Sequence, residues 1–525
     1  MKKLMTWLRG PAALAALAGV AAAAVVLSVA ELAGAFFTAR ATPLIALGST
    51  FIDFTPPWLK DFAVTTFGTN DKAALFVGMG VTIFVLACVL GVVAYRRWAL
   101  GAAGVLFMGA VIVASVVTRA GVRPQDAVPS LVGTAAGLVV LRLLVWRLWR
   151  LQAFPASPAD VAAKEPERPA TSRRAFFAAT GLTAAAAAIA ATGGRLLSTA
   201  RSNVAQARES LRLPAPARPA AAVPAGMQSA TPGVTPWLTP GKDFYRIDTA
   251  LSVPEIKAEE WELRVHGLVE QEVRLTFRDL LDADLIESHV TLTCVSNPVG
   301  GNLAGNAKWL GLPIREVLKR ARPTAGADMV LSTSIDGFSA STPLEVLQDD
   351  RDAMLAIGMN GGPLPLEHGY PVRMVVPGLY GFVSATKWVV DLEVTRFADS
   401  KAYWTQRGWS ERGRIKTMAR VEVPKSFATV PAGKVAIGGT AWAQTRGITK
   451  VEVQIDEGDW TAAVLSDEAS VDTWRQWSFT WDAKPGPHYI KVRATDGSGE
   501  VQTEKRADPV PDGASGWQSV MGTVE

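Results

Sequence analysis

The sequence predicts a multi-domain protein in which an N-terminal region of all-α transmembrane helices is followed by an α+β domain and then by an all-β immunoglobulin-like sandwich. Hydrophobic residues make up 49% of the 525 residues, and the apolar excess lies almost entirely before residue 200, which indicates a membrane region joined to a water-soluble one. From about residue 241, short strand patterns alternate with short helical ones. After about residue 425, only short strands separated by turn residues follow.

The first 150 residues (1–150) are expected to cross the membrane four times. Apolar runs of about 20 residues match the length of a transmembrane helix, and they occur near residues 12–34, 73–95, 99–118 and 128–146. Prolines and aspartates interrupt the segment 43–69, which is expected to be an interfacial loop. All four histidines of the chain follow residue 260, so these helices offer no histidine ligand for haem, and we expect no haem in this chain.

The positively charged residues beside these helices favour a cytoplasmic N-terminus. Most lysines and arginines near the helix ends fall on one side of the membrane, while Arg119 and Arg123 fall on the other; positive charge collects on the cytoplasmic side. With a fifth helix near residues 175–197, everything after residue 198 is expected outside the cytoplasm. This predicts a multi-pass protein of a bacterial cell membrane, with the lipid bilayer as a partner and its later domains on the extracytoplasmic side.

The segment 151–198 is expected to contain a cytoplasmic loop, an export motif and the fifth helix. Ser172-Arg173-Arg174-Ala175-Phe176-Phe177 is typical of a twin-arginine signal, although a pair of arginines before a membrane helix also fits the ordinary positive-inside rule. The twin-arginine export machinery, a predicted partner, carries folded proteins. The motif therefore predicts a domain downstream that receives a cofactor before export.

Three regions are predicted after the fifth helix. Residues 199–240 are rich in Ala and Pro and are expected to form an extended linker. Residues 241–425 contain a strand pattern at WELRVHG (261–267) and a short helical pattern at PIREVLKRA (313–321), which together indicate an α+β domain. Residues 426–525 show the closely spaced strands of an immunoglobulin-like sandwich.

Cys294 lies in TLTCVSNPVGGNLAGNAKWLG (291–311). The only other cysteine, Cys88, is in an apolar run, so a disulfide framework is not expected. The isolated sulfur of Cys294 is an inert buried group, a nucleophile, or a metal ligand. A nucleophilic thiolate requires a neighbouring His, and the sequence has no Cys–His signature. A thiolate suits a soft metal, but one cysteine makes a metal site only where a cofactor supplies the other ligands. The residues alone leave these alternatives open.

Two long segments resemble the sulfite oxidase family of molybdenum enzymes. One is TLTCVSNPVGGNLAGNAKWLGLPIREVL (291–318), in which a cysteine ends a strand and a GNA-x-W-x-G segment follows. The other is GMNGGPLPLEHGYPVRMVVPGLYGFVSATKWV (358–389). The resemblance implies a sulfite-oxidase-type molybdopterin-binding domain over 241–425, whose cofactor is molybdenum held by a pyranopterin dithiolene. It also implies that the C-terminal sandwich corresponds to a dimerisation domain, and hence a homodimer.

The resemblance implies roles for particular side chains. Cys294 takes the position of the metal ligand and Arg246, in DFYRIDTAL, that of an arginine near the metal; both are candidate catalytic residues. A planar guanidinium and a lysine suit a phosphate dianion, and an aspartate accepts from pterin N–H groups. The implied cofactor-binding residues are Phe244, Arg246, Asp336, Asn360, His368, Arg373, Ser384 and Lys387.

The sequence departs from the family at three positions. Val299 stands where an arginine is expected five residues after the ligand cysteine, and Asp248 stands where His is common. The catalytic tyrosine of the family falls in the segment 404–409, which has Trp in its place. An oxyanion substrate requires converging cationic donors, so these departures argue against sulfite itself.

Three functions are compatible with these patterns. The first is a membrane-anchored molybdenum oxidoreductase that transfers an oxygen atom to or from a small, sulfur-containing substrate. The second is a sulfoxide reductase of the same family, and the third is a non-catalytic anchored binding module. The sequence has no motif for a second redox cofactor, so a separate electron-transfer partner is expected. The net charge of +5 and the lack of a basic, aromatic stripe argue against nucleic acid as a partner.

Overall fold

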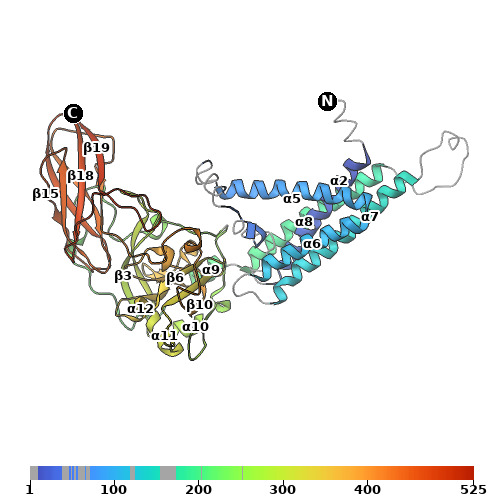
Figure 1. Cartoon of the computed structure of the whole chain (residues 1–525), viewed down its shortest axis with the longest axis horizontal. Coiled ribbons are helices and arrows are strands. Elements are labelled where there is room, and N and C mark those ends of the chain that lie inside the picture. Colours follow the sequence, from blue (N-terminus) through green and yellow to red (C-terminus); the bar gives the residue numbers. More distant parts are fainter. Residues whose placement is uncertain are drawn as a thin grey trace, which may run out of the picture. The chain divides into compact units, whose positions relative to one another are not determined.

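The computed structural model describes residues 10–37, 46–48, 50–51, 55–56, 59, 66, 71–118, 124–153, 173–202, 204–250 and 252–525. The chain divides into two compact units, Met1–Asn203 with Ala250–Ser252 and Val204–Thr249 with Val253–Glu525. The first consists of long helices and the second is rich in strands (Figure 1). The predicted change from a helical to a strand-rich region is therefore confirmed.

The long helices of the first unit coincide closely with the predicted apolar ranges. Five helical segments among the described residues are long and apolar enough to cross a membrane. The predicted loop 43–69 falls mostly outside the described residues, and so does Ser172 of the export motif. The long helices are α2 (Pro11–Gly34), α5 (Asp71–Arg96), α6 (Trp98–Val117), α7 (Val128–Ala153) and α8 (Arg173–Ser202).

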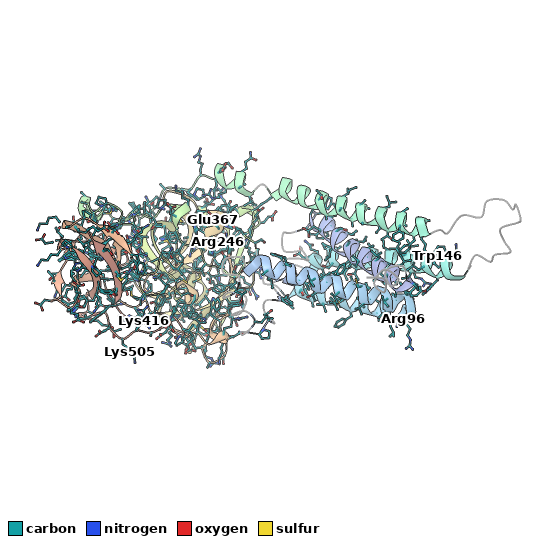
Figure 2. All side chains as sticks on the ribbon, turned by 90° about the horizontal axis from the view of Figure 1, so that it is seen from above. Arg96, Trp146, Arg246, Glu367, Lys416 and Lys505 are labelled. Carbon is teal, nitrogen blue, oxygen red and sulfur yellow. The ribbon has the colours of Figure 1, made fainter. Side chains whose placement is uncertain are left out.

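Small residues allow these helices to pack closely. A Cβ atom on Gly19 of α2 would lie 2.0 Å from the carbonyl oxygen of Ala87 of α5, and one on Gly91 would lie 2.2 Å from that of Ala15. Such close backbone approach is typical of membrane helices. Phe176 of the predicted export motif is buried in the same helical core, and Arg96 ends α5 (Figure 2).

The segment expected to be a linker, 199–240, is extended only from residue 211, because its first residues belong to α8 and to α9, and from residue 204 it is part of the second unit. After the short helix α9 (Val204–Ser210), residues 211–240 contain isolated turns and no long element. Arg208 donates hydrogen bonds to the carbonyl oxygens of Leu364 and Pro363, at 2.5 and 2.7 Å. The prolines account for the extended backbone of residues 211–240. The N–H of Ala217 donates to the carbonyl oxygen of Leu285 and that of Thr239 to the carbonyl oxygen of Asn306, both at 2.8 Å, and these bonds hold the segment on the domain.

The α+β domain contains two five-stranded sheets. One has the order β2-β1-β10-β5-β6, in which only β1 and β10 pair in parallel. The other has the order β3-β4-β7-β8, with β9 also paired to β7. Buried side chains at Ile314, Val317, Leu318 and Ala321 give α11 its apolar face. The elements are β1 (Glu262–Gly267), β2 (Val273–Thr276), α10 (Phe277–Leu281), β3 (Ile286–Thr293), β4 (Ala304–Pro313), α11 (Ile314–Ala321), β5 (Met329–Ser334), β6 (Ser339–Pro343), α12 (Leu344–Gln348), β7 (Met354–Met359), β8 (Gly362–Pro363), β9 (Arg373–Val375) and β10 (Val389–Thr395).

The C-terminal region is formed by two sheets that share one hydrophobic core. Their orders are β11-β13-β17-β16 and β12-β19-β18-β14-β15, and the core residues come from both sheets. Apolar residues alternate with polar ones along β18, as expected for a strand with one buried face. The strands are β11 (Met418–Val423), β12 (Ala428–Val430), β13 (Gly433–Trp442), β14 (Ile448–Ile455), β15 (Thr461–Ala462), β16 (Val464–Leu465), β17 (Arg475–Ala483), β18 (Gly486–Asp496) and β19 (Gln518–Val524).

Candidate functional site

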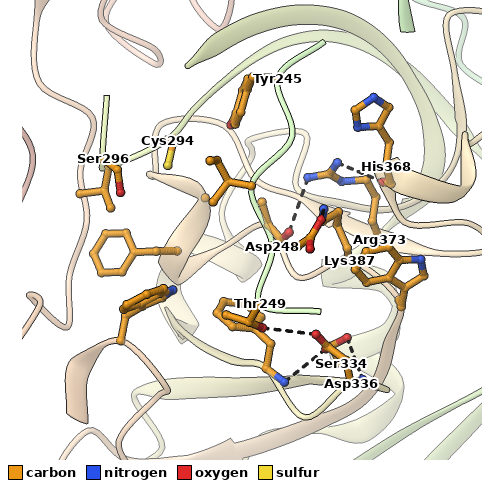
Figure 3. A pocket seen from close by; sticks show the side chains of 18 of the residues that line it. Tyr245, Asp248, Thr249, Cys294, Ser296, Ser334, Asp336, His368, Arg373 and Lys387 are labelled. Carbon is orange, nitrogen blue, oxygen red and sulfur yellow. Dashed lines mark hydrogen bonds and ion pairs between the residues drawn. The ribbon is translucent and has the colours of Figure 1, made fainter. Parts of the chain in front are cut away.

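A pocket in the second unit lies beside Cys294 (Figure 3). Five segments that are distant in sequence line it: the strand-like segment 244–249, the loop at 294–296, the turn at 334–338, residues from 368 to 388, and the tryptophans of 404–409. The space inside the pocket and its open mouth together amount to about 880 Å³. Six of the predicted site residues line it, namely Phe244, Cys294, Asp336, His368, Arg373 and Lys387.

Cys294 directly follows β3 and begins a tightly closed loop. Its backbone N–H donates to the carbonyl oxygen of Leu303 (2.9 Å), and its own carbonyl oxygen accepts from the N–H of Asn297 (3.1 Å). The side chain of Asn297 closes the same loop by accepting from the N–H of Leu303 (2.9 Å). The Gly- and Asn-rich sequence therefore folds back on β4 and holds the thiol at the pocket wall, where Cys294 is 8% exposed.

Ser296 supplies hydrogen bonds to the thiol of Cys294. Burial raises the pKa of Cys294, while hydrogen bonds from the backbone and side chain of Ser296 act in the opposite direction. These donors favour the thiolate, the form that binds a metal. Sequence analysis did not select Ser296, because a serine two residues after a cysteine is not distinctive.

Arg373 places a positive charge in the wall of the pocket. It is 5% exposed, and burial lowers its pKa to about 10. Its hydrogen bonds to the described residues go to carbonyl oxygens, with the His368 oxygen at 3.1 Å from Nη1. A buried cation without a carboxylate partner destabilises the folded state, so the site favours binding of an anionic ligand.

The backbone brings Lys387 beside Arg373. These two residues form an isolated antiparallel bridge, and Gly369 permits it by adopting φ of +110° where a Cβ would meet Arg373 Cβ at 3.0 Å. The Nζ of Lys387 donates to Asp248 Oδ2 (2.9 Å) and to the carbonyl oxygen of Glu367 (3.1 Å). Burial lowers the pKa of Lys387 to about 8, and Asp248 partly offsets this effect. A lysine has three N–H donors, so one remains for a ligand.

His368 is buried and neutral at pH 7. Burial lowers its pKa to about 4, and its Nε2 lies 2.9 Å from the carbonyl oxygen of Gly241. Because a carbonyl oxygen only accepts, Nε2 carries the proton and Nδ1 is an acceptor. The ring packs edge-on against Phe244, with centroids 5.5 Å apart. Phe244 occupies the space over Gly305, whose Cβ would lie 2.7 Å from the phenyl ring.

Asp336 lies at the opposite end of the pocket from His368 in Figure 3. Its carboxylate accepts from the hydroxyl of Thr249 (3.3 Å) and from the backbone N–H of Phe338 (3.3 Å). The second bond closes the turn between β5 and β6, and the first ties the segment 244–249 to this turn.

The other three predicted residues are not among those that line the pocket. Arg246 is 41% exposed and pairs with Asp248 (2.8 Å). Asn360 connects backbone segments, since it accepts from the N–H of Lys308 and donates to the carbonyl oxygen of Thr239, both at 2.9 Å. The hydroxyl of Ser384 is buried and donates to the carbonyl oxygen of Tyr380 (3.0 Å).

Aromatic side chains form much of the remaining wall. Trp404 and Trp409 have centroids 6.1 Å apart, and Trp409 also lies 5.9 Å from Phe382. Tyr245 faces the pocket near Cys294 (Figure 3). Burial raises the pKa of its hydroxyl, and the negative charge of the Cys294 thiolate raises it further. Tyr245 is not among the residues predicted from the sequence, although it lies between the predicted residues Phe244 and Arg246.

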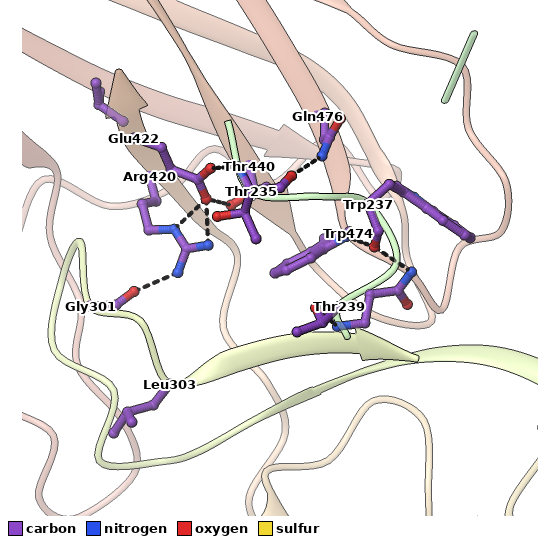
Figure 4. Close-up of polar contacts among 12 residues, drawn as sticks. Thr235, Trp237, Thr239, Gly301, Leu303, Arg420, Glu422, Thr440, Trp474 and Gln476 are labelled. Atoms are coloured by element: carbon purple, nitrogen blue, oxygen red, sulfur yellow. Dashed lines mark hydrogen bonds and ion pairs between the residues drawn. The ribbon is translucent and has the colours of Figure 1, made fainter. Parts of the chain in front are cut away.

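The C-terminal sandwich supports the loop that follows Cys294 (Figure 4). Arg420 of β11 donates from Nη1 to the carbonyl oxygen of Gly301 (2.7 Å) and pairs with Glu422 (2.5 Å). Trp474 donates from Nε1 to the carbonyl oxygen of Trp237 (2.9 Å), and Glu422 also accepts from the N–H of Thr235 (2.6 Å). The loop, the expected linker and the sandwich therefore form one hydrogen-bonded assembly.

Comparison with known proteins identifies the class of this site. Residues 250–404 match the model of the oxidoreductase molybdopterin-binding domain family. Sulfite oxidase of Gallus gallus is 27% identical over 320 residues, which cover 52% of this chain and 69% of that protein. Nitrate reductase [NADH] of Spinacia oleracea is 28% identical over 317 residues, which cover 48% of this chain and 34% of that protein. The chain therefore spans about a third of that nitrate reductase.

Residues 250–404 are an oxidoreductase molybdopterin-binding domain similar to that of the sulfite oxidases, and this domain marks the chain as an enzyme. Among solved structures it is similar to the sulfane dehydrogenase SoxCD of Paracoccus pantotrophus, with 23% identity and a TM-score of 0.49 over 56% of this chain and 85% of that one. The match to the molybdopterin-binding domain and the similarity to sulfite oxidase confirm the resemblance drawn from the sequence.

The residues of the pocket fit the cofactor that this family implies. Arg373 is a buried cation that its protein partners do not neutralise, and Lys387 keeps one donor beside it, as a phosphate group requires. Cys294 offers one sulfur at the other side of the pocket. Its single thiolate is sufficient where the dithiolene of the cofactor supplies further sulfur ligands.

Proposed function

We propose that this protein is a membrane-anchored, extracytoplasmic oxidoreductase that uses molybdenum bound to molybdopterin to transfer an oxygen atom to or from a small, sulfur-containing substrate. The observation that carries the proposal is the presence of Cys294 and the unneutralised Arg373 in the wall of one pocket. When bound, the cofactor supplies the two-electron change and the site of oxygen transfer.

The pocket residues are assigned to binding and orientation. Cys294 ligates the metal, and the hydrogen bonds from Ser296 favour its thiolate form, against the burial that raises its pKa. Arg373 and Lys387 hold the phosphate, while the neutral His368 and the carboxylate of Asp336 recognise the pterin as acceptors. Phe244 packs behind His368. Asn360 and Ser384 act by fixing the backbone around the site, and Arg246 acts at the edge of the pocket by orienting Asp248.

The direction of the reaction has two candidates. Oxidation of a reduced sulfur compound is one, and reduction of a sulfoxide is the other. The aromatic wall favours the second candidate, because Trp404, Trp409 and Phe382 suit the apolar groups of a sulfoxide better than a small oxyanion. Either direction requires a separate electron-transfer partner. A substrate screen with sulfite as donor and methionine sulfoxide as acceptor separates the candidates.

The anchoring is supported by the five apolar helices and by the twin-arginine motif before the fifth. A bacterial cell membrane, export by the twin-arginine machinery and an extracytoplasmic site belong to this proposal. The immunoglobulin-like identity of the sandwich and its use as a homodimer contact belong to it too. Light scattering of the full chain in detergent tests the dimer, since a monomeric mass contradicts it.

The experiment that tests the function is the metal content and activity of the purified full chain, made in cells that synthesise the cofactor. Wild type and Cys88→Ser, which removes the other cysteine, should contain molybdenum and turn over one of the two substrates. Cys294→Ser should be inactive. A wild-type protein without molybdenum, or a fully active Cys294→Ser variant, would overturn the proposal, including the assignment as an enzyme rather than an anchored binding module.

A further inference from the structure

Tyr245 presents an unused hydrogen-bond donor to the pocket. Its ring stacks on Phe244, with centroids 5.3 Å apart and an interplanar angle of 19°. The hydroxyl makes no hydrogen bond to any residue that the structure describes, and the two charged groups that act on it are Cys294 and Arg373. The hydroxyl faces the pocket, so it can donate to a molecule bound there.

The segment that carries Tyr245 is held on both sides. On one side, Phe244 is wedged between Gly305 and His368. On the other side, Asp248 is tied to Lys387 (2.9 Å) and Thr249 to Asp336 (3.3 Å). The hydroxyl is therefore positioned in advance, and little entropy is lost when it binds a ligand.

A second tyrosine near Cys294 shows what distinguishes Tyr245. Burial raises the pKa of Tyr380, and the nearby Cys294 thiolate adds to this effect. However, the hydroxyl oxygen of Tyr380 accepts from the backbone N–H of Lys416 (3.3 Å), and Tyr380 is not among the residues that line the pocket. Proximity to the sulfur is common to both tyrosines, whereas only Tyr245 offers a free donor to the pocket.

The surroundings of Tyr245 indicate which oxygen it binds. Lys387 and Arg246 both pair with Asp248, and in the proposed function Arg373 is occupied by the cofactor phosphate. Val295, Phe382 and the two tryptophans complete the wall. A full negative charge beside Cys294 would meet few cations there, whereas a neutral oxygen attached to apolar groups matches one hydroxyl donor and an aromatic wall.

We propose that Tyr245 is the residue that donates a hydrogen bond to the reacting oxygen of the substrate, and that this substrate is a neutral oxide with apolar substituents. This inference rests on the proposed function. Tyr245 comes from a different segment of the chain than the family's tyrosine, whose segment here contains Trp404 and Trp409. Its hydroxyl orients the substrate oxygen toward the metal side of the pocket, while the aromatic wall holds the substituents.

The test is equilibrium dialysis of the full-length, cofactor-loaded protein with two probes, methyl phenyl sulfoxide and methyl phenyl sulfide. The sulfide keeps the shape but lacks the oxygen. Removal of one neutral hydrogen bond is worth about 3- to 10-fold in affinity, so Tyr245→Phe should weaken sulfoxide binding by that factor and leave sulfide binding unchanged. Tyr380→Phe, the matched control, should bind both probes as wild type does.

Different results would contradict the role of Tyr245 and the proposed function. Unchanged sulfoxide binding by Tyr245→Phe, equal losses for both probes, or tighter binding of sulfate than of sulfoxide by wild type would each overturn the inference while leaving a molybdenum enzyme in place. Wild-type protein without molybdenum would overturn the proposed function, and the inference with it.

Discussion

The buried guanidinium of Arg373 should reduce the stability of the cofactor-free protein. Replacing it by Met, as Arg373→Met, removes the charge and keeps a long apolar side chain. The expected result is a small gain in the free energy of unfolding without cofactor and a loss of cofactor retention. Such a gain would identify Arg373 as a residue maintained for binding rather than for folding.

The magnitude follows from the environment of Arg373. Burial lowers its pKa from 12.5 to about 10, which corresponds to about 3 kcal/mol of destabilisation at pH 7, where the group is charged in both the folded and unfolded states. Arg373 is 5% exposed, so solvent screening is slight. Loss of the hydrogen bonds to the carbonyl oxygens of His368 (3.1 Å) and Met374 (3.3 Å) costs about 1 kcal/mol each. The third bond, to Ala385 at 3.5 Å, is long and contributes little. A net stabilisation of about 1 kcal/mol is expected.

Arg420 provides a matched comparison, because it is equally buried but paired. It is 6% exposed and contacts Glu422, whose side chain is 9% exposed. Arg420→Met leaves that carboxylate buried without its cation, which costs about 3 kcal/mol. It also removes the hydrogen bond to Gly301 and so loosens the loop after Cys294.

The assay is denaturant unfolding of the full chain in detergent, made without cofactor and followed by tryptophan fluorescence. Arg373→Met should unfold at a slightly higher denaturant concentration than wild type, and Arg420→Met at a clearly lower one. A loss of 2 kcal/mol or more (about the cost of two unpaired acceptors) in Arg373→Met would refute the reasoning, because Arg373 would then be part of the structural framework.

Three further predictions concern the site and its export. The pKa of His368 is about 4 in the folded state and 6.5 in the unfolded state, so the unfolded state takes up the proton first as the pH falls. The free energy of unfolding of wild type, relative to that of His368→Gln, should therefore decrease by up to about 3 kcal/mol between pH 6.5 and 4. The same pH dependence in both proteins would contradict the burial of a neutral His368. Gly369→Ala should lower the free energy of unfolding by about 2 kcal/mol and Gly361→Ala by about 1 kcal/mol. Both glycines have positive φ, but only a Cβ at 369 would meet Arg373 and Lys387. Equal losses in unfolding experiments would show that this close approach is unimportant. The double variant Arg173→Lys/Arg174→Lys should leave the second unit inaccessible to external protease. In the control, Arg147→Lys/Arg150→Lys, the second unit should remain accessible. Normal export of the Arg173→Lys/Arg174→Lys variant would show that these arginines are not a twin-arginine signal.

The helices and the general order of the fold could be predicted because each depends on a local pattern. A run such as 99–118 is apolar throughout, and the alternation along the C-terminal strands is local as well. The packing of residues 211–240 could not be predicted, since it depends on partners distant in sequence. Ala217 and Thr239 donate backbone hydrogen bonds to the carbonyl oxygens of Leu285 and Asn306, and no rule based on composition distinguishes such a segment from a free tether.

Only the site residues that belong to long sequence motifs could be predicted. Cys294, His368, Arg373 and Lys387 belong to two recognisable segments and lie in one pocket. The pairing of Asp248 with Lys387 and the free hydroxyl of Tyr245 depend on how 244–249 crosses the pocket, which is a tertiary property. For the same reason the sequence did not show that Asn360 serves as a backbone connector.

X-ray absorption at the molybdenum edge tests the central claim most directly, because it counts the sulfur atoms bound to the metal. The full-length wild type and Cys88→Ser should show identical sulfur coordination, made of the cofactor sulfurs and one protein thiolate. Cys294→Ser should lose one sulfur while the pterin is retained by Arg373 and Lys387. An unchanged sulfur count in Cys294→Ser would contradict the assignment of Cys294 as the metal ligand.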